Sequence, residues 1–491
     1  YDARGGRASV LRPDGRRVST PRDASGRVVE LADEGLIHGV YARSSAGLLV
    51  SAQAGNGLSL SFMRSAASGA PTLGAYDALG RALEARITRA GETVLGYEYG
   101  RNASGAPLFE RRLHERNAPG DVWRYDSIYR VVRYLPDVVD PRVPPIDPVR
   151  KIDFTLDASH NWRVLEIDQG VRSVSVDALG RITSIAGDPV AWDDAGNLVS
   201  YGARRVYHDA LGRPVRIVDG GEDVARFTWD ADGAIDIDGA RRGRRVTRTL
   251  LRSSPGEPAG TRRAIWDGLA MIEERDGDGR LLREWLYPEE GDPPAVLVRH
   301  DAMGSALVYL VSDARGNVTG AFAPDASLLE EVRYGPFGKP IVLNSFGNPV
   351  SVPVSGNTLL FGSSPFDFTT GLISNGDRLF VPDLGRHASE RSPFVIADPL
   401  ERNGWLSPGL SGMPGRFPGQ GLPDERDPIV DRVLESLKGL GETSAEPALP
   451  STFQTSPARE LLPRAMLSLL ELRIDARMLD DAPTSTTGGR P

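Results

Sequence analysis

The sequence predicts an all-β protein made of successive hairpins, and three observations lead to this prediction. A five-residue unit with Asp first and Gly fourth begins at residues 177, 193 and 209, so its copies are 16 residues apart. Apolar and polar residues alternate on both sides of the units, as in Val174–Val176 and Ile182–Ile185, and such alternation is typical of half-buried strands. A fixed period indicates that one structural unit is repeated and stacked.

Each unit has the composition of a tight turn. Asp in the first position can accept hydrogen bonds from N–H groups further along the turn, and Gly in the fourth position can take the positive φ that closes a type I turn into a hairpin. One such hairpin buries too little apolar surface to be stable alone, so the hairpins are expected to continue into one long sheet. The predicted turn pairs are Asp77 and Gly80, Asp177 and Gly180, Asp193 and Gly196, Asp209 and Gly212, Asp301 and Gly304, and Asp313 and Gly316.

Composition narrows the classes of function. The 491-residue chain has a net charge of −8, which argues against a general nucleic-acid binder. It contains no Cys, which excludes disulfides and thiolate metal sites, and its six His residues are scattered, so each is expected to be structural. No apolar run reaches the ~18 residues that a membrane helix needs. We therefore expect no metal, no cofactor, no nucleic acid and no membrane span.

Three stretches depart from the repeat. Five prolines lie between Pro136 and Val149, and because proline cannot donate to a strand ladder, this stretch is expected to cross outside the sheet. The Arg-rich residues 240–263 indicate a solvated strand face or loop, with a nucleic-acid patch as the alternative. Asp276–Arg280 resembles the start of a calcium loop, but the following residues lack its next ligand and its turn Gly, so a hairpin turn is expected.

Residues 300–386 carry a resemblance to a known family. His300-Asp301-Ala-Met-Gly304-Ser305 resembles the His-Asp-His-Leu-Gly-Ser element of the Rhs/YD-repeat family, at the opening of its repeat-associated core. Tyr334-Gly-Pro336-Phe337-Gly338 resembles the Tyr-Asp-Pro-Phe-Gly element, with Gly in place of Asp. Shorter matches follow at the family's spacing at 360–362, 370–372, 378–380 and 384–386. The resemblance covers about residues 1–400.

The resemblance implies a spiralling β-sheet shell, a cage or barrel of the kind that this family shares with insecticidal toxin-complex shells and teneurin barrels. It also implies a secreted or cell-surface bacterial protein whose own C-terminal segment, often a toxin, is the cargo. The implied domains are a repeat shell at 1–298, a degenerate repeat-associated core at 299–400, a Gly/Pro-rich linker at 401–426 and a variable tail at 427–491. The chain opens without Met or a signal peptide, so we expect it to be the C-terminal part of a longer protein, with its targeting segment upstream.

In many members the core is an aspartyl autoprotease with two Asp-Pro-x-Gly elements. Asp398-Pro399-Leu-Glu401 stands at the first element, with Glu in place of Gly, and the second is missing where the family places it. Such a site needs one protonated and one charged acid at the scissile bond. Asp398, with Arg378 as its neighbour, is the candidate set for self-cleavage, and a plain turn at Asp398 is the alternative.

The tail and the function complete the expectations. Apolar residues at helical spacing predict one short helix after Asp427 and a second over Ala458–Leu479. The leading hypothesis is a non-catalytic shell that encapsulates or displays the C-terminal segment. The alternatives are a self-cleaving toxin precursor that releases the tail, and a cell-surface module that binds a glycan or a protein.

Overall fold

The computed structural model describes residues 2, 6–62, 64–65, 71–72, 75–102, 105–146, 148–230, 234–235, 241–254, 257–289, 291–376 and 378–389. The chain divides into two compact units, one of Tyr1–Asp77 with Arg81–Gly421 and the other of Ala78–Gly80 with Leu422–Pro491. Nearly all described residues belong to the first unit. The linker predicted at 401–426 and the helical tail predicted at 427–491 lie outside the described residues.

Strands make up the fold. The elements of the described residues are 38 strands and one 3₁₀ turn, η1 (Phe361–Ser363), so the prediction of an all-β fold is confirmed. Thirty of these strands belong to one long antiparallel sheet. Along β22, for example, buried side chains are interspersed with exposed ones. The alternation of apolar and polar residues in the sequence therefore corresponds to the two faces of a strand.

The strand bounds are as follows. The first part of the chain forms β1 (Ser9–Leu11), β2 (Arg17–Ser19), β3 (Glu30–Asp33), β4 (Leu36–Arg43), β5 (Leu49–Ala54), β6 (Ser59–Ser61), β7 (Arg64–Ser65), β8 (Pro71–Thr72), β9 (Glu84–Arg89), β10 (Glu92–Arg101), β11 (Pro107–Arg112), β12 (Gly120–Tyr125) and β13 (Val131–Val138). The middle part forms β14 (Ile152–Leu156), β15 (Trp162–Ile167), β16 (Gly170–Val176), β17 (Ile182–Ile185), β18 (Asp188–Trp192), β19 (Leu198–Tyr201), β20 (Arg204–His208), β21 (Pro214–Asp219), β22 (Glu222–Trp229), β23 (Ala234–Ile235), β24 (Arg241–Arg242) and β25 (Arg245–Leu250). The last part forms β26 (Gly260–Asp267), β27 (Ala270–Asp276), β28 (Leu281–Leu286), β29 (Val296–Asp301), β30 (Gly304–Ser312), β31 (Val318–Phe322), β32 (Leu328–Tyr334), β33 (Pro340–Asn344), β34 (Pro349–Val350), β35 (Phe366–Asp367), β36 (Leu372–Asn375), β37 (Arg378–Val381) and β38 (Arg386–His387).

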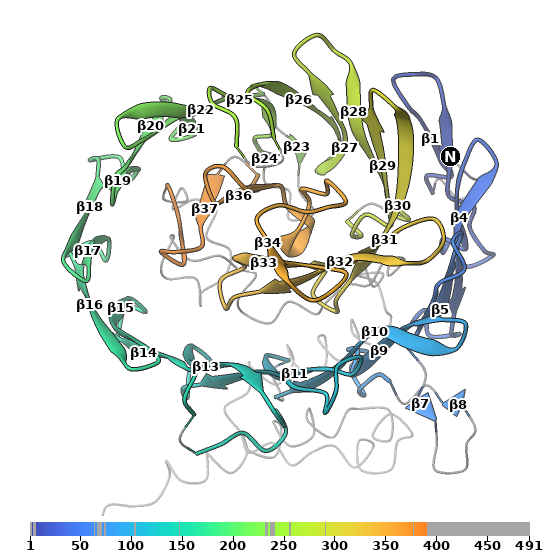
Figure 1. The fold of residues 1–491 in the computed structure, drawn as a ribbon, viewed down its shortest axis with the longest axis horizontal. Helices are drawn as coiled ribbons and strands as arrows, with labels where there is room; N and C mark the ends of the chain where they lie inside the picture. The colour runs from blue at the N-terminus through green and yellow to red at the C-terminus, as the bar shows by residue number, and fades with distance from the viewer. Residues whose placement is uncertain are drawn as a thin grey trace, which may run out of the picture. The chain divides into compact units, whose positions relative to one another are not determined.

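The long sheet is a meander, because each strand pairs with the one before it and the one after it (Figure 1). The exceptions are β6, which pairs with β9, and β22, which pairs with β25, since the short pairs β7–β8 and β23–β24 lie between them in the sequence. The sheet runs without a break from β25 through β34. It therefore continues past residue 298, where the implied repeat shell ends and the implied core begins. A separate four-stranded sheet follows, in the order β35 to β38.

The turn from Asp209 to Arg213 represents the repeated unit. Oδ1 of Asp209 accepts hydrogen bonds from the backbone N–H groups of Leu211 and Arg213, at 2.9 and 3.0 Å. Gly212 has φ of 73° and donates its N–H to the carbonyl of Asp209 at 3.0 Å. Positive φ also occurs at the glycines in the fourth positions of the other predicted turns, namely Gly80, Gly180, Gly196, Gly304 and Gly316.

The turn at Asp301 is shorter than the other turns. Asp301 pairs directly with Gly304 at the ends of β29 and β30, so two residues connect these strands. Oδ1 of Asp301 accepts the N–H of Met303 at 2.8 Å, and Gly304 has φ of 133°. The Asp and Gly therefore close a two-residue hairpin rather than the five-residue turn seen at Asp209.

The proline-rich stretch begins later than the sequence predicted. Strand β13 continues through Pro136 to Val138, so this part of the predicted crossing segment lies inside the sheet. The ladder between β12 and β13 shifts register between Gly120 and Val122, and the shift accommodates Pro136 without a donor. The prediction was wrong for these three residues because a bulge tolerates a proline.

Replacing Gly180 or Gly212 with Val is expected to lower the free energy of unfolding by about 2 kcal/mol, since a β-branched residue is strained at positive φ. A Cβ on Gly212 would also lie 2.8 Å from Oδ1 of Asn197. Gly335 provides the matched control, because its φ is not positive and the nearest atom to its Cβ would be 3.8 Å away. Urea unfolding of Gly180→Val, Gly212→Val and Gly335→Val tests this, and equal midpoints in all three would contradict the turn assignment.

Long-range contacts join the first strands of the sheet to much later ones. The guanidinium of Arg12 donates to the carbonyls of Ile272 and Trp285 at 3.1 and 2.6 Å. Asn56 donates to the carbonyl of Ala323 at 3.0 Å. One apolar cluster contains buried residues from both regions, including Leu31 and Phe322. The sheet of this unit therefore curves until β1–β6 contact β27–β32.

Candidate functional site

The last described residues, 355–389, pack on the inner side of the curved sheet, where they are coloured orange in Figure 1. We call them the docking segment. Leu372, Leu379 and Leu384 of this segment belong to the same buried apolar cluster as Trp162 and Ile182 of β15 and β17. The docking segment therefore packs against strands that lie about 200 residues earlier in the sequence. We treat its contacts with the sheet as the candidate functional site.

Asn residues in three turns provide polar contacts for the docking segment. Asn161, Asn197 and Asn317 stand where other turns carry Arg, and each donates its side-chain N–H to the Asp of its own turn at 3.2, 2.9 and 2.8 Å. Asn161 Oδ1 accepts a bond from the Arg386 guanidinium at 2.8 Å. Asn317 Oδ1 accepts the N–H of Gly362, also at 2.8 Å. At Asn197 the contact is a strand-like bridge to Ser389.

Arg in the same turn position acts differently. Arg181 donates Nη1 to the carbonyl of Asp193, the first residue of the next turn, at 3.0 Å, and Arg213 donates Nη1 to the carbonyl of Asp230, which follows β22, at 2.8 Å. A guanidinium can only donate, whereas an amide side chain also has an acceptor. Arg therefore ties one segment of the sheet to the next, whereas Asn161 and Asn317 supply side-chain acceptors to the docking segment.

A buried ion pair attaches β35 to β25. Asp367 is 3% exposed, and its carboxylate lies 3.2 Å from the guanidinium of Arg248. Burial alone would raise the pKa of Asp367, but Arg248 and Arg245 outweigh it and hold this pKa below its usual value. Both arginines are buried, so this part of the Arg-rich stretch is not the solvated face that the sequence predicted. The acids Asp367 and Glu257 explain the difference, because they neutralise Arg248 in the interior.

Two further contacts fix the start of the docking segment. Glu330 of β32 accepts the N–H of Ser355 at 3.0 Å and its hydroxyl at 2.5 Å. Burial raises the pKa of Glu330, although these bonds oppose the shift. The indole N–H of Trp285 donates to Asn357 Oδ1 at 3.0 Å, and both side chains are buried.

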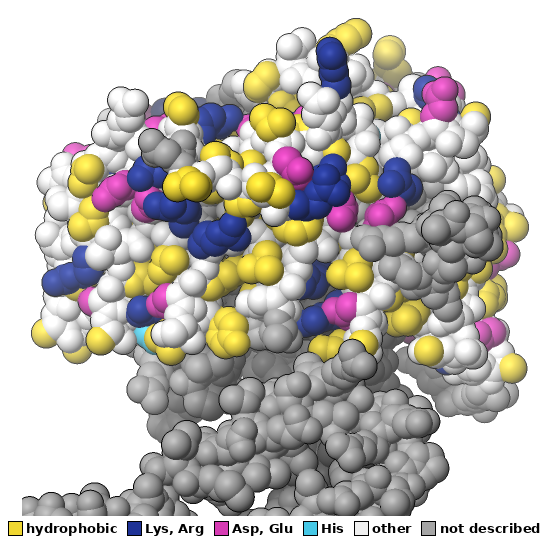
Figure 2. All heavy atoms as spheres, turned by 90° about the horizontal axis from the view of Figure 1, so that it is seen from below, with side chains coloured by type: hydrophobic (Ala, Val, Ile, Leu, Met, Phe, Trp, Pro, Cys, Tyr) yellow, Lys and Arg dark blue, Asp and Glu magenta, His cyan; other side chains and the backbone are white. Residues whose placement is uncertain are grey.

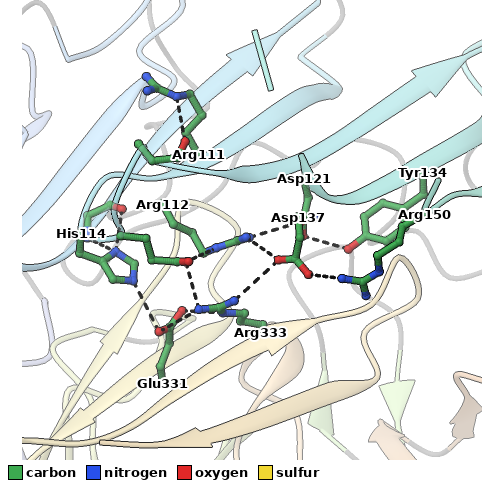
Figure 3. Close-up of polar contacts among 12 residues, drawn as sticks. Arg111, Arg112, His114, Asp121, Tyr134, Asp137, Arg150, Glu331 and Arg333 are labelled. Carbon is green, nitrogen blue, oxygen red and sulfur yellow. Dashed lines mark hydrogen bonds and ion pairs between the residues drawn. The ribbon is translucent and has the colours of Figure 1, made fainter. Parts of the chain in front are cut away.

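A second polar network joins β32 to β11 and β13 (Figure 3). Arg112 is buried and lies 2.6 Å from Asp137. Arg333 pairs with Glu331 at 2.9 Å and reaches Asp137 at 3.7 Å. His114 Nε2 lies 3.5 Å from the other oxygen of Glu331. The network thus connects residues about 200 positions apart through alternating charges.

His114, Glu115 and Glu331 have ligand atoms close enough together to suggest a metal site, within 4.8 Å of one another. Both carboxylates already have cationic partners, because Arg333 lies 3.0 Å from Glu115 and 2.9 Å from Glu331. Arg112 also pairs with Glu115, so two positive charges lie beside these carboxylates and oppose a bound cation. We therefore assign the group to the ion-pair network.

Glu331 is expected to make stability depend on pH. Burial would raise its pKa, but hydrogen bonds from His114 and Arg333 lower it from 4.5 to about 2. A carboxyl with a depressed pKa in the folded state stabilises the protein above its unfolded pKa, and this contribution, about 3 kcal/mol, is lost as pH falls from about 4.5 towards 2. Urea unfolding of the wild type and Glu331→Gln at pH 7 and pH 3 tests this. A difference between the two proteins that is equal at both pH values would contradict it.

The two residues proposed for self-cleavage are placed differently by the structure. Arg378 is described: it lies in β37, is 9% exposed, and donates Nη1 to the carbonyl of Ser389 at 3.3 Å. Asp398 lies outside the described residues. The structure therefore gives the position of Arg378 but no distance between the two side chains.

Comparisons with known proteins bear on the fold. No family model matches the sequence, and no curated protein matches it. Solved structures do match: the Tc holotoxin pore of Photorhabdus luminescens has a TM-score of 0.64 and 16% identity over 87% of this chain. A TcdB2-TccC3 structure has 0.63 and 16% over 86%, and TcdB2-TccC3 without its hypervariable C-terminal region has 0.61 and 16% over 86%.

The chain shares its fold with a segment of these toxin-complex proteins. It spans 21–22% of the length of their chains. At 16% identity the likeness establishes the fold, which is the Rhs-like, all-β shell architecture that the sequence resemblance implied.

Proposed function

We propose that this chain is part of a secreted, toxin-associated bacterial shell, and that its sheet holds the C-terminal segment of the same chain as cargo. The observation that carries the proposal is the docking segment, which binds the inner side of the sheet through the Asn turns, the Asp367–Arg248 pair and a shared apolar cluster. The chain that follows Ser389 therefore starts from a fixed position on the sheet. The fold shared with toxin-complex proteins supports the same function.

The proposed function includes no nucleic-acid partner, as the net charge of −8 leads us to expect. Figure 2 shows one face on which basic, acidic and hydrophobic side chains are interspersed. Mixed charge of this kind produces no extended positive field to attract a polyanion. Among the described residues, no helix has the length and the apolar character needed to cross a membrane.

Limited proteolysis of the full chain tests the cargo proposal. Arg386 is 1% exposed and donates to Gly180 O and Asn161 Oδ1, both at 2.8 Å, so Arg386→Gln should loosen the docking segment. Arg205 is exposed in β20, and Arg205→Gln is the matched control. Trypsin digestion is followed by intact mass. Cleavage at the Arg and Lys residues that follow Ser389 should be slow in the wild type and the control, and at least tenfold faster in Arg386→Gln. Equally fast cleavage in all three would overturn the proposal.

Self-cleavage near residues 400–430 is a second candidate, which rests on the resemblance of Asp398-Pro399 to the first element of the family's autoprotease. A cut there would divide the 52.9 kDa chain into two species. Asp398→Asn should then give one intact species while the wild type gives two. A single species of full mass from both proteins would exclude self-cleavage.

A further inference from the structure

Three side chains on neighbouring strands form a connected series from the interior to the surface. Oγ of Ser305 lies 2.8 Å from Nδ1 of His300, and Nε2 of His300 lies 2.7 Å from Oε1 of Glu284. Glu284 is 0% exposed, the His300 side chain is 22% exposed, and Ser305 is exposed. The acid is thus enclosed by protein while the hydroxyl meets solvent.

Strand register explains why these residues meet. His300 of β29 is directly opposite Ser305 of β30, and Glu284 of β28 is opposite Val298. Alternate residues of a strand point to the same face, so Val298 and His300 share a face and Glu284 is the diagonal neighbour of His300. The two-residue turn after Asp301 fixes this register, since it sets which residues of β29 and β30 are opposite.

The hydrogen bonds determine the tautomer of His300. An ionised carboxylate can only accept, so Glu284 requires the proton of His300 on Nε2. Nδ1 then carries the free lone pair and accepts the hydroxyl proton of Ser305. The second oxygen of Glu284 pairs with Arg16, which also lies 2.7 Å from Asp33. Arg16 thus binds the oxygen of Glu284 that His300 does not use, and the two contacts fix the orientation of the carboxylate.

We propose that Ser305, His300 and Glu284 form a Ser–His–Glu triad that hydrolyses carboxylic esters. A hydroxyl bonded to a base, with the base oriented by a buried acid, is the arrangement that activates a serine nucleophile. Ser305 and His300 are the catalytic residues, and Glu284 positions His300. This activity is separate from the cargo proposal and does not depend on it.

The reaction proceeds in two balanced steps. Ser305 Oγ attacks the ester carbonyl carbon while its proton passes to His300 Nδ1, and the C–O bond then breaks as the leaving alcohol takes that proton. Water next attacks the carbonyl carbon of the acyl-serine and gives a proton to His300 Nδ1. The bond between that carbon and Ser305 Oγ then breaks, His300 returns the proton to Oγ, and the carboxylic acid is released. Met303, which is 98% exposed in the adjoining turn, offers an apolar contact for the substrate. Small esters with an apolar group are therefore the class that this open site would take.

Hydrolysis of p-nitrophenyl acetate by the full chain, together with covalent labelling by a fluorophosphonate probe, tests the proposal. The wild type should release p-nitrophenolate in a burst of about one per chain, and mass spectrometry should find the probe on Ser305. Ser305→Ala should lose the labelling and lower the rate at least 100-fold. Ser59→Ala is the control, because the Ser59 hydroxyl bonds Gln53 at 2.5 Å rather than a base.

Two further variants separate catalysis from folding. His300→Gln should lower the rate as much as Ser305→Ala while leaving the circular dichroism spectrum unchanged. Glu284→Gln should lower kcat at least tenfold with KM unchanged, measured well below its melting temperature. The proposal is overturned if the wild type reacts no faster than Ser305→Ala, or if the probe labels another residue.

Discussion

Replacing Asp367 with Asn is expected to lower the free energy of unfolding by about 3 kcal/mol and to release the docking segment from β25. Asp367 and Arg248 are both buried, and removing one partner of a buried pair leaves the other charge without full compensation. Asn keeps the shape of Asp and can still accept the N–H of Thr369, to which Asp367 is bonded at 2.9 Å. The substitution therefore removes the negative charge of Asp367 but keeps its hydrogen bond to the turn, so it measures the contribution of the charge alone.

Asp140 provides a matched control at the surface. Asp140 also accepts a turn N–H, from Arg142 at 3.2 Å, and its carboxylate pairs with the guanidinium of Arg142 at 3.1 Å. Unlike the buried pair, the side chains of Asp140 and Arg142 are 43% and 50% exposed. Solvent screens an exposed pair of this kind, so Asp140→Asn should change the free energy of unfolding little. Urea unfolding of both variants gives the comparison. If they lose equal stability, the buried pair does not hold the docking segment.

The repeated turns could be predicted from the sequence because their chemistry is local. Asp and Gly three positions apart determine both the acceptor and the positive φ, as at Asp209 and Gly212. Turns in which another residue takes the Gly position were missed. Tyr129 and His160 have φ of 63° and 68° in turns closed by Asp126 and Asp157, so a search for Gly could not find them.

The docking contacts could not be predicted, because they join residues that no local pattern relates. Arg386 and Asn161 are 225 positions apart, and only the curvature of the sheet brings them together. A signal was nevertheless present in the repeat. Asn replaces Arg at the fifth position in the turns of Asn161, Asn197 and Asn317, and a buried acceptor there indicates a partner outside the turn.

The Ser–His pair shows a different limit. His300 and Ser305 belong to one family-like element, and His300 was expected, like the other five His residues, to be structural. Their spacing around a two-residue turn would place them directly opposite each other, but Asp301 and Gly304 also fit a longer turn, in which the register differs. Glu284 adds nothing to the local pattern, because its strand pairs with β29 after a connection of several residues.

Gly120→Ala is expected to lower the free energy of unfolding by about 3 kcal/mol or more. A Cβ at this position of β12 would overlap the backbone carbonyl oxygen of Glu110 in β11, so the two strands would have to separate and lose ladder hydrogen bonds. The neighbouring Asp121 accepts the Tyr134 hydroxyl at 2.9 Å and pairs with Arg112 in the network of Figure 3. Because Asp121 would move with the strand, these two contacts would be disturbed as well.

Gly170→Ala is the control for this substitution. Gly170 begins β16, and its Cβ would be 3.5 Å from the nearest atom, the carbonyl oxygen of Ile167, which is an ordinary contact. Its loss of stability should stay within about 0.5 kcal/mol. Thermal and urea unfolding of both variants measure the difference. Equal stability of Gly120→Ala and Gly170→Ala would mean that β11 and β12 do not approach as closely as the register of Gly120 with Arg111 requires. A large loss confined to Gly120→Ala would instead show that the close approach of β11 and β12 at this residue stabilises the sheet.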